Sequence, residues 1–230
     1  MTAVIAHRGC SEGFVENTLE AFGEARRLGA DGVELDVRLT ADGALAVHHD
    51  GVIPGQGPVS ALEVRDLPPH VPLLGDALGV CEGMVVNVEI KNAPADPGHD
   101  PTEAVAALTA ACIGEAGWTE RVLVSSFQIG TLRAVQVADS RLALGALWPV
   151  LAEAKGALAL AVDAGFRAVH PFVTTVTPDL VARAHGAGLA VNVWTVNAPG
   201  DLARCIGLGV DAVITDRLSE AMEAARPEGA

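Results

Sequence analysis

The chain has 230 residues, 50% of them hydrophobic, and a formal net charge of −14 from 15 basic and 29 acidic residues. This excess of acidic residues repels nucleic-acid phosphates and anionic lipids. Five Phe, three Trp and no Tyr leave few rings for stacking on bases. The composition therefore argues against a nucleic-acid partner and against stable membrane association, and it leaves the oligomeric state unknown.

The sequence contains no segment typical of export or membrane insertion. No run approaches the roughly 18 consecutive apolar residues of a membrane-spanning helix. Residues Met1–Arg8 lack the basic start and the long apolar run of a secretory signal. Scattered cysteines without CxxC spacing are typical of buried, reduced thiols. We therefore predict a cytoplasmic protein with four unpaired thiols, at Cys10, Cys81, Cys112 and Cys205.

Short β-branched runs alternate with longer Ala- and Leu-rich amphipathic runs along the chain. The predicted strands are Ala3–Ala6, Gly32–Val37, Ala44–His48, Val85–Ile90, Val122–Ser126, Leu142–Leu147, Ala168–His170, Ala190–Thr195 and Ala212–Thr215. The predicted helices are Asn17–Leu28, Thr102–Ala116, Ile129–Val137, Leu151–Ala164, Pro178–Ala187 and Pro199–Leu208. Regular alternation of strand and helix is typical of a parallel sheet covered by helices.

The predicted strands are one too many for an eight-stranded barrel. Only a turn around Ala41–Gly43 separates Gly32–Val37 from Ala44–His48, so we expect these two strands to pair as a hairpin. The remaining units predict an α/β fold, a (β/α)8 TIM barrel. An open doubly wound sheet is the alternative, but no GxGxxG sequence opens a helix. We expect a single domain over residues 1–225 and a frayed tail over 226–230.

Two segments carry little periodicity and are predicted to be irregular. Gly51–Pro72 is rich in Gly and Pro and is interpreted as an excursion from the barrel. Asn92–Pro101 follows the strand Val85–Ile90. Both come after strand ends, and in a (β/α)8 barrel the carboxyl ends of the strands form the active-site face.

Acidic residues lie where a barrel strand would otherwise be apolar. Glu34 and Asp36 are two positions apart on one strand, so both side chains project from the same face. Glu89, on the next parallel strand, can supply a third carboxylate. Three carboxylates without Cys suit Mg²⁺ or Ca²⁺ better than zinc. The alternative is that Glu34 or Glu89 is a rim residue paired with Arg38 or Lys91.

Lys91 and Arg8 are the candidate phosphate ligands. Lys91 shares the face of Glu89 by the same spacing rule, and Arg8 follows the first strand. Beside a metal, either cation would bind an anionic oxygen, most simply that of a phosphate. Two alternatives stay open: each is a solvated surface cation, or Lys91 forms a Schiff base, which an adjacent Glu disfavours.

Histidines end two of the early strands. His7 and His49 each stand beside a charged residue, and an imidazole pair near a metal suits proton transfer in both directions. His48 should point to the opposite side of its strand from His49. The four remaining histidines have no such neighbours and are interpreted as structural; they are His70, His99, His170 and His185.

Further residues have weaker assignments. Asn17 begins a capping-box-like sequence and is expected to start the first helix, and Glu16 can pair with Arg8 or the metal site. Trp194 is expected either to form an apolar wall against a small substrate or to pack in the core. We also ask whether the thiol of Cys10 lies at the mouth of the site, where alkylation would lower activity.

Several motifs occur in a distinctive order, and with them the chain resembles the glycerophosphodiester phosphodiesterase family from about residue 3 to about residue 219. These motifs are His7-Arg8-Gly9, Glu16-Asn17-Thr18, Glu34-Leu35-Asp36-Val37, His49-Asp50, Glu89-Ile90-Lys91, Trp194-Thr195-Val196-Asn197 and Thr215-Asp216. The resemblance implies a TIM barrel of the phospholipase-C-like type with one divalent cation. It also implies hydrolysis of glycerophosphodiesters to glycerol 3-phosphate and an alcohol.

The resemblance implies a role for each matching residue. Glu34, Asp36 and Glu89 are the implied metal ligands, and His7 and His49 the implied general acid/base pair. The implied substrate-binding residues are Arg8 and Lys91 at the phosphate and Trp194 near the glycerol moiety.

Two other functions remain as alternatives for the same set of residues. One is a lyase that stops at a cyclic phosphate. The other is a catalytically silent barrel that binds a phosphorylated metabolite.

Overall fold

Eight parallel strands close into a barrel in this computed structural model, which describes residues 1–148 and 151–226. The strands follow the order β1-β11-β10-β9-β8-β7-β6-β2, and β1 closes the ring by pairing with β2. They are β1 (Ala3–His7), β2 (Gly32–Leu39), β6 (Val85–Ile90), β7 (Val122–Ser126), β8 (Ala143–Trp148), β9 (Ala168–Pro171), β10 (Ala190–Val193) and β11 (Ala212–Thr215). The predicted TIM barrel is confirmed, and the open doubly wound sheet is excluded.

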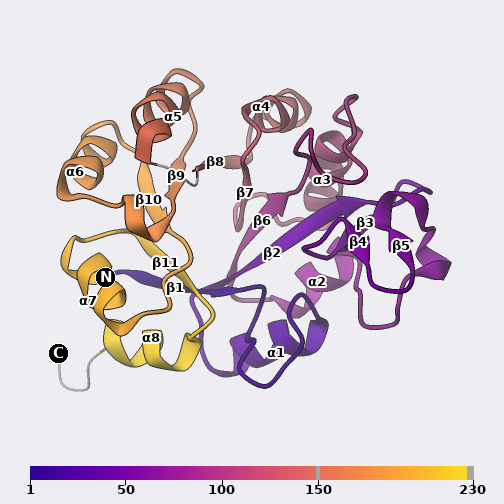
Figure 1. The fold of residues 1–230 in the computed structure, drawn as a ribbon, viewed down its shortest axis with the longest axis horizontal. Helices are drawn as coiled ribbons and strands as arrows, with labels where there is room; N and C mark the ends of the chain where they lie inside the picture. The colour runs from indigo at the N-terminus through magenta and orange to yellow at the C-terminus, as the bar shows by residue number, and fades with distance from the viewer. Residues whose placement is uncertain (149–150, 227–230) are drawn as a thin grey trace.

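Helices surround the ring of strands in chain order (Figure 1). They are α1 (Leu19–Arg27), α2 (Leu74–Val80), α3 (Ala104–Glu115), α4 (Ile129–Ala138), α5 (Leu151–Asp163), α6 (Pro178–Gly186), α7 (Pro199–Gly207) and α8 (Leu218–Ala225). One large apolar cluster between strands and helices contains side chains such as Val4, Phe22, Leu35 and Leu132. Each of the six predicted helices is present. None of the described helices is long and apolar enough to span a bilayer.

The predicted hairpin is confirmed. β3 (Leu45–Val47) pairs antiparallel with β2 through a turn in which Thr40 N–H donates to Ala44 O at 2.9 Å. The following excursion contains a small antiparallel pair, β4 (Val52–Ile53) and β5 (Gly57–Pro58), which lies outside the ring in Figure 1. Its apolar side chains pack on Ala46 of β3, so this segment has its own small core; they are Ile53, Val59, Leu62, Leu67 and Val71.

Three helix details differ from expectation. α1 begins at Leu19, because the Thr18 side chain accepts from Ala21 N–H at 3.2 Å and acts as the N-cap that we had assigned to Asn17. Two helices are present that the sequence pattern did not predict: α2, which contains two glycines, and α8. In both helices, packing compensates for low propensity or short length: Leu74 and Leu218 are fully buried. The predicted tail lies outside the described residues except for Arg226, whose guanidinium is 2.6 Å from Asp31.

A neutral histidine lies inside the barrel. His170 is 0% exposed, and its Nε2 is 3.1 Å from Asn192 Nδ2. Gly145 on the neighbouring strand leaves room for the ring, since a Cβ there would lie 2.5 Å from Nε2. Burial lowers the pKa of His170 to about 3. The interpretation of His170 as a structural residue is consistent with this position.

The buried His170 should make the fold acid-sensitive. Its folded-state pKa of about 3 lies below the unfolded value, so its contribution to stability is complete above about pH 6.5 and is lost as the pH falls toward 3. Between pH 7 and pH 5, wild-type protein should lose about 2 kcal/mol more of its unfolding free energy than His170→Gln. Urea unfolding in EDTA at both pH values measures this. His70→Gln, at an exposed histidine, is the matched control; equal pH dependence in all three proteins would contradict the prediction.

Candidate active site

Three buried carboxylates of β2 and β6 meet near the level at which β1 ends with His7. Glu34 and Asp36 project from the same face of β2, and Asp36 lies opposite Glu89 of β6 in the strand register. Each offers an oxygen within 4.8 Å of the others, and none is more than 7% exposed. The predicted grouping of these acids is therefore present.

The electrostatics of this cluster favour a bound cation. Burial and the charge of Asp36 raise the pKa of Glu34 to about 8. Burial also raises the pKa of Glu89, although Lys91 opposes it. Asp36 differs: burial disfavours its ionised form, but Lys91 and Arg8 lower its pKa to about 2. Oε1 of Glu34 has no hydrogen-bond partner among the described residues. Three clustered carboxylate oxygens fit a hard divalent cation, which would offset their repulsion.

Two cations flank the carboxylates. Lys91 Nζ is 3.0 Å from Asp36 Oδ1 and also pairs with Glu89. Arg8 Nε is 3.3 Å from Asp36 Oδ2, and its guanidinium donates to Glu16 at 2.8 Å, as expected for Glu16. Burial opposes the charge of Lys91, but Glu89 and Asp36 raise its pKa above the ordinary value. A protonated amine is not nucleophilic, which argues against the Schiff-base alternative.

His7 is held by residues from the end of the chain. Its Nδ1 is 2.6 Å from Asp216 Oδ1, and its Nε2 is 3.8 Å from Glu34. Asn197 Nδ2 donates to the other oxygen of Asp216 at 2.6 Å. Burial lowers the pKa of His7, but the bond to Asp216 and the charge of Glu34 outweigh it, so the pKa is raised. A divalent cation at the carboxylates would offset part of this effect.

His49 follows β3, the hairpin partner of β2. Its Nδ1 is 2.8 Å from Asp50, and its carbonyl oxygen accepts from Arg38 Nε at 2.8 Å. Arg38 in turn lies 3.3 Å from Asp96, so the alternative pairing of Arg38 with the acidic cluster is wrong. Burial lowers the pKa of His49, since Asp36 opposes this only in part. His7 and His49 thus approach the carboxylates from different strands.

The structure shows two residues that position site side chains, and it corrects the predictions for Asn17 and Cys10. Asn17 has a φ of 55° and donates from Nδ2 to Asp36 at 2.8 Å, so it orients a carboxylate instead of capping α1. Asp216 orients His7; the sequence analysis singled out the motif Thr215-Asp216 without giving Asp216 a role. Cys10 is 1% exposed and packs in the apolar core, so our idea of a thiol at the mouth is wrong. The remaining cysteines are also unpaired.

Trp194 stands just after β10 within an aromatic group. Its ring meets Phe127 edge-on at 5.4 Å and Phe172 at 5.1 Å, and its Nε1 donates to the carbonyl of His170 at 2.7 Å. The side chain is half-buried. The indole is therefore held by a hydrogen bond and remains partly exposed. This position is compatible with an apolar wall at the barrel mouth.

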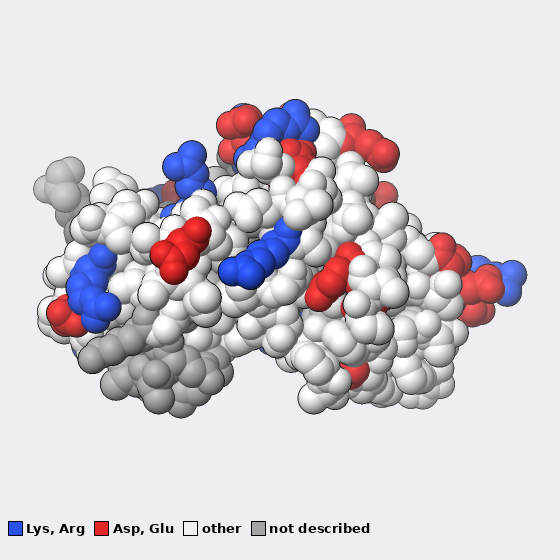
Figure 2. Space-filling view, turned by 90° about the horizontal axis from the view of Figure 1, so that it is seen from above, with Lys and Arg blue, Asp and Glu red and all other residues white. Residues whose placement is uncertain are grey.

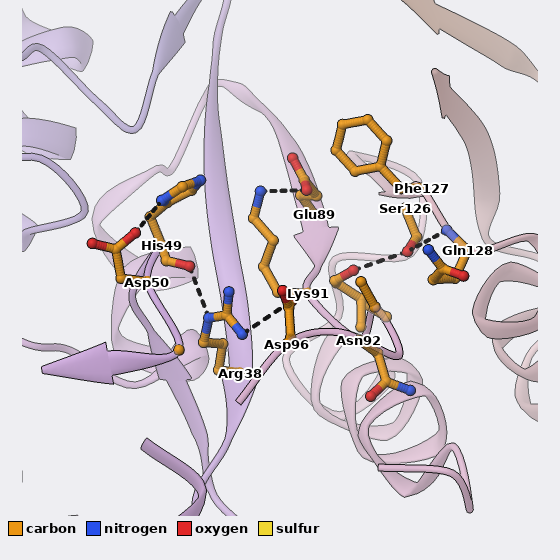
Figure 3. A pocket seen from close by; sticks show the side chains of 13 residues that line it. Arg38, His49, Asp50, Glu89, Lys91, Asn92, Asp96, Ser126, Phe127 and Gln128 are labelled. Carbon is orange, nitrogen blue, oxygen red and sulfur yellow. Dashed lines mark hydrogen bonds and ion pairs between the residues drawn. The ribbon is translucent and has the colours of Figure 1, made fainter. Parts of the chain in front are cut away.

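A cavity of about 310 Å³ opens beside the carboxylates (Figure 3). Three of its lining residues, His49, Glu89 and Lys91, belong to the cluster just described. Lys91 Nζ also lies 5.9 Å from the centre of the Phe127 ring on the same wall. The cavity therefore provides space for a small ligand directly beside His49, Glu89 and Lys91.

Residues 7–220 match the sequence profile of the glycerophosphoryl diester phosphodiesterase family. The chain belongs to this family. A glycerophosphodiester phosphodiesterase of Caldanaerobacter subterraneus is 33% identical, with 94% of each chain covered. One of Bacillus altitudinis is 30% identical over 94% of this chain and 95% of the relative.

Solved structures of the glycerophosphodiester phosphodiesterases share the fold. A structure from Parabacteroides distasonis superposes with a TM-score of 0.88 at 24% identity, covering 100% of this chain and 98% of that one. A phosphodiesterase of Oleispira antarctica, solved with its product sn-glycerol-3-phosphate, has a TM-score of 0.87 at 23% identity and covers 97% and 96%. Together with the two relatives named above, which are glycerophosphodiester phosphodiesterases over almost the whole length of this chain, they identify this chain as an enzyme.

Lys and Arg side chains do not form a patch of their own on the face of this phosphodiesterase shown in Figure 2. Lys and Arg side chains are isolated there and interspersed with Asp and Glu side chains. That face therefore has no continuous basic patch of the kind that nucleic-acid binding requires.

Proposed function

We propose that residues 1–225 form a single domain that hydrolyses glycerophosphodiesters to glycerol 3-phosphate and an alcohol with the help of one divalent cation, Mg²⁺ or Ca²⁺. The observation that carries this is the buried triad Glu34, Asp36 and Glu89, flanked by two cations and two histidines. The Oleispira antarctica relative with bound sn-glycerol-3-phosphate supports the product. The four unpaired cysteines support a reducing, cytoplasmic location.

The carboxylates would hold the cation, and their chemistry fits it. All three ligands are oxygens, which hard divalent ions prefer, and Glu34 Oε1 has no other partner among the described residues. When bound, such an ion polarises a phosphoryl oxygen and neutralises charge that develops on it. Asn17 and Arg8 keep Asp36 in place through the contacts described above.

Arg8 and Lys91 would bind the substrate's phosphate. Both are partly exposed toward the site, at 18% and 12% of their side chains, and both are already fixed by carboxylates. Negative charge accumulates on the phosphoryl oxygens as the nucleophile adds, and pre-oriented cations stabilise that charge most. Trp194 and Phe127 would provide the apolar surface for the carbon skeleton of the glycerol moiety.

His7 and His49 would move the protons. The attacking oxygen, from water or from the neighbouring 2-hydroxyl, forms a bond to phosphorus and gives its proton to one imidazole. The bond between phosphorus and the departing oxygen breaks, and the other imidazole protonates that oxygen. If the 2-hydroxyl attacks first, a cyclic phosphate forms, and water opens it with the two roles exchanged. Asp216 orients His7 for either role.

The test is release of glycerol 3-phosphate from glycerophosphocholine and glycerophosphoethanolamine, followed by ³¹P NMR. We expect EDTA to abolish turnover and Mg²⁺ or Ca²⁺ to restore it, since the carboxylates lose their counter-charge without the ion. Accumulation of a cyclic phosphate as the end product would instead indicate the lyase. A folded, metal-loaded protein that turns over neither ester would contradict the proposal.

A further inference from the structure

A second cavity lies at the end of the barrel where the strands begin, opposite the candidate active site; we call it the amino-end cavity. Its volume is about 200 Å³. Asp31, Val85 and Asp211 line its mouth, at or just before the starts of their strands, and all three are at least partly exposed. The amino-end cavity is therefore accessible from solvent without passage through the site of the three carboxylates.

Small and polar side chains leave this space open. The interior of such a barrel is usually filled by layers of branched apolar side chains. Here Ala3 and Ala212 lie opposite each other on β1 and β11. Asn87 of β6 and Asn192 of β10 also line the cavity. Two alanines are too short to fill the barrel at this level, and two amides add polar groups to the lining.

Two buried polar groups in the lining lack partners. Asn87 is 7% exposed and His170 is fully buried, and neither Asn87 Oδ1 nor His170 Nδ1 has a hydrogen-bond partner among the described residues. When His170 Nε2 accepts from Asn192 Nδ2, the proton of the neutral ring is on Nδ1. The lining thus has an unused acceptor and an unused donor. Because buried polar groups without partners are costly, an occupant that carries both a donor and an acceptor is favoured.

Size and charge limit what the amino-end cavity can hold. A cavity of about 150 Å³ is enough for a molecule of the size of benzene, so this one holds roughly six to eight non-hydrogen atoms. Its described lining contains no Lys or Arg, and the carboxylates of Asp31 and Asp211 stand at its mouth, so an anion would be repelled. Arg226 and His185 already pair with these two carboxylates, so a cation would gain little there. An uncharged occupant is favoured.

An apolar layer separates the amino-end cavity from the barrel mouth. Ile5 and Ile214 line the cavity, and they stand two positions before His7 and Asp216, respectively. Both isoleucines belong to one apolar cluster, against which Trp194 packs. None of the residues to which we have given a role in the reaction lines this cavity. A ligand there would contact none of the groups assigned to the phosphodiester.

We propose that the amino-end cavity is a second binding site, which takes small uncharged molecules with hydroxyl or amide groups. Asn87 accepts a hydrogen bond from the ligand, and Ile5 and Ile214 contact its carbon atoms. The site does not depend on the proposed hydrolysis, because the two sets of residues do not overlap.

Glycerol is the probe for this site, since it has six non-hydrogen atoms, three hydroxyl groups and no charge. Protein labelled with ¹³C at the isoleucine δ1 methyl groups, loaded with Mg²⁺, is titrated with glycerol and followed by NMR. We expect saturable shifts of the Ile5 and Ile214 signals, while those of Ile53 and Ile113, in other parts of the core, do not move. An excess of sn-glycerol 3-phosphate, which would occupy the candidate active site, should leave these shifts unchanged.

Two substitutions separate a built site from a space that holds only water. Asn87→Leu keeps the approximate size of the side chain and removes the acceptor, so the Kd for glycerol should rise about fivefold or more. Ala212→Phe fills the cavity and should abolish the glycerol-dependent shifts. Ala187→Leu is the matched control and should bind like wild type, because Ala187 is exposed between α6 and β10, at the same end of the barrel, and does not line the cavity.

The methyl spectrum itself shows whether each variant is folded, and Asn87→Leu decides the matter if Ala212→Phe is not. Shifts that increase linearly without saturation would mean that water alone fills the cavity, and they would overturn the proposal. Displacement of glycerol by sn-glycerol 3-phosphate, or unchanged binding in Asn87→Leu, would place the glycerol elsewhere and would also overturn it. None of these outcomes affects the proposed hydrolysis, which turnover of the phosphodiesters tests separately.

Discussion

Replacing His49 by alanine should lower kcat on glycerophosphocholine by about 10²- to 10⁴-fold, the usual contribution of a positioned acid or base. The same variant should recover most of this loss on the 4-nitrophenyl ester of glycerol 3-phosphate. Nitrophenolate is a stable anion and departs without a proton, whereas a choline alkoxide does not. His49 lines the cavity in which the alcohol would leave, which is why its loss should depend on the leaving group.

Steady-state kinetics on both esters measures this effect. His48→Ala is the matched control, because His48 is the chain neighbour of His49 and does not line the cavity. It should stay within a few-fold of wild type on both esters. If His49→Ala loses equal activity on the two esters, His49 does not protonate the departing oxygen.

Replacing Glu34 by glutamine should have opposite effects on metal binding and on stability. Glutamine keeps the shape of the side chain but removes one anionic ligand, so the Kd for Mg²⁺ or Ca²⁺ should rise at least tenfold and turnover should fall about 10³-fold. The folded-state pKa of Glu34, about 8, lies above its unfolded value. Metal-free wild type therefore loses stability as the pH rises from about 4.5 to 8, and the variant should not.

Calorimetric titration and urea unfolding in EDTA at pH 8 measure the two effects. We expect the variant to be more stable than wild type by on the order of a few kcal/mol under these conditions. Glu82→Gln is the control, since the Glu82 side chain is 77% exposed and Glu82 precedes β6, at the opposite end of that strand from Glu89. A variant that still binds the ion tightly, or that is destabilised in EDTA, would contradict the role given to Glu34.

Residues on regular strands were predictable from the sequence. Side chains alternate along a strand, so Glu34 and Asp36 had to share a face, and Glu89 and Lys91 had to share one on the neighbouring strand. The two-residue spacing and the order of the strands were enough to predict that these side chains would lie together. The same regularity predicted the barrel, because eight strand–helix units remain once β3 is recognised as a hairpin partner.

Positions that depend on irregular backbone or on distant contacts were not predictable. Asn17 reaches Asp36 only because it adopts a φ of 55°, and a local sequence pattern favoured a cap instead. Arg38 and Asp96 are 58 residues apart and meet through a loop without periodicity. The cavity itself depends on where that loop lies, so neither its size nor its charge could be inferred beforehand.

The pairing of β1 with β11 has a consequence for the order in which the chain can become active during synthesis. His7 emerges before the other residues of the site, and the carboxylate that orients it belongs to Asp216, 209 positions later, beyond β11. A nascent chain lacking that strand can fold helices and pair early strands, but it leaves His7 without its partner. Activity should therefore appear only once β11 has paired with β1 and closed the barrel. Incomplete translation products should contain the strands with the three carboxylates, but their His7 should lack the contact with Asp216.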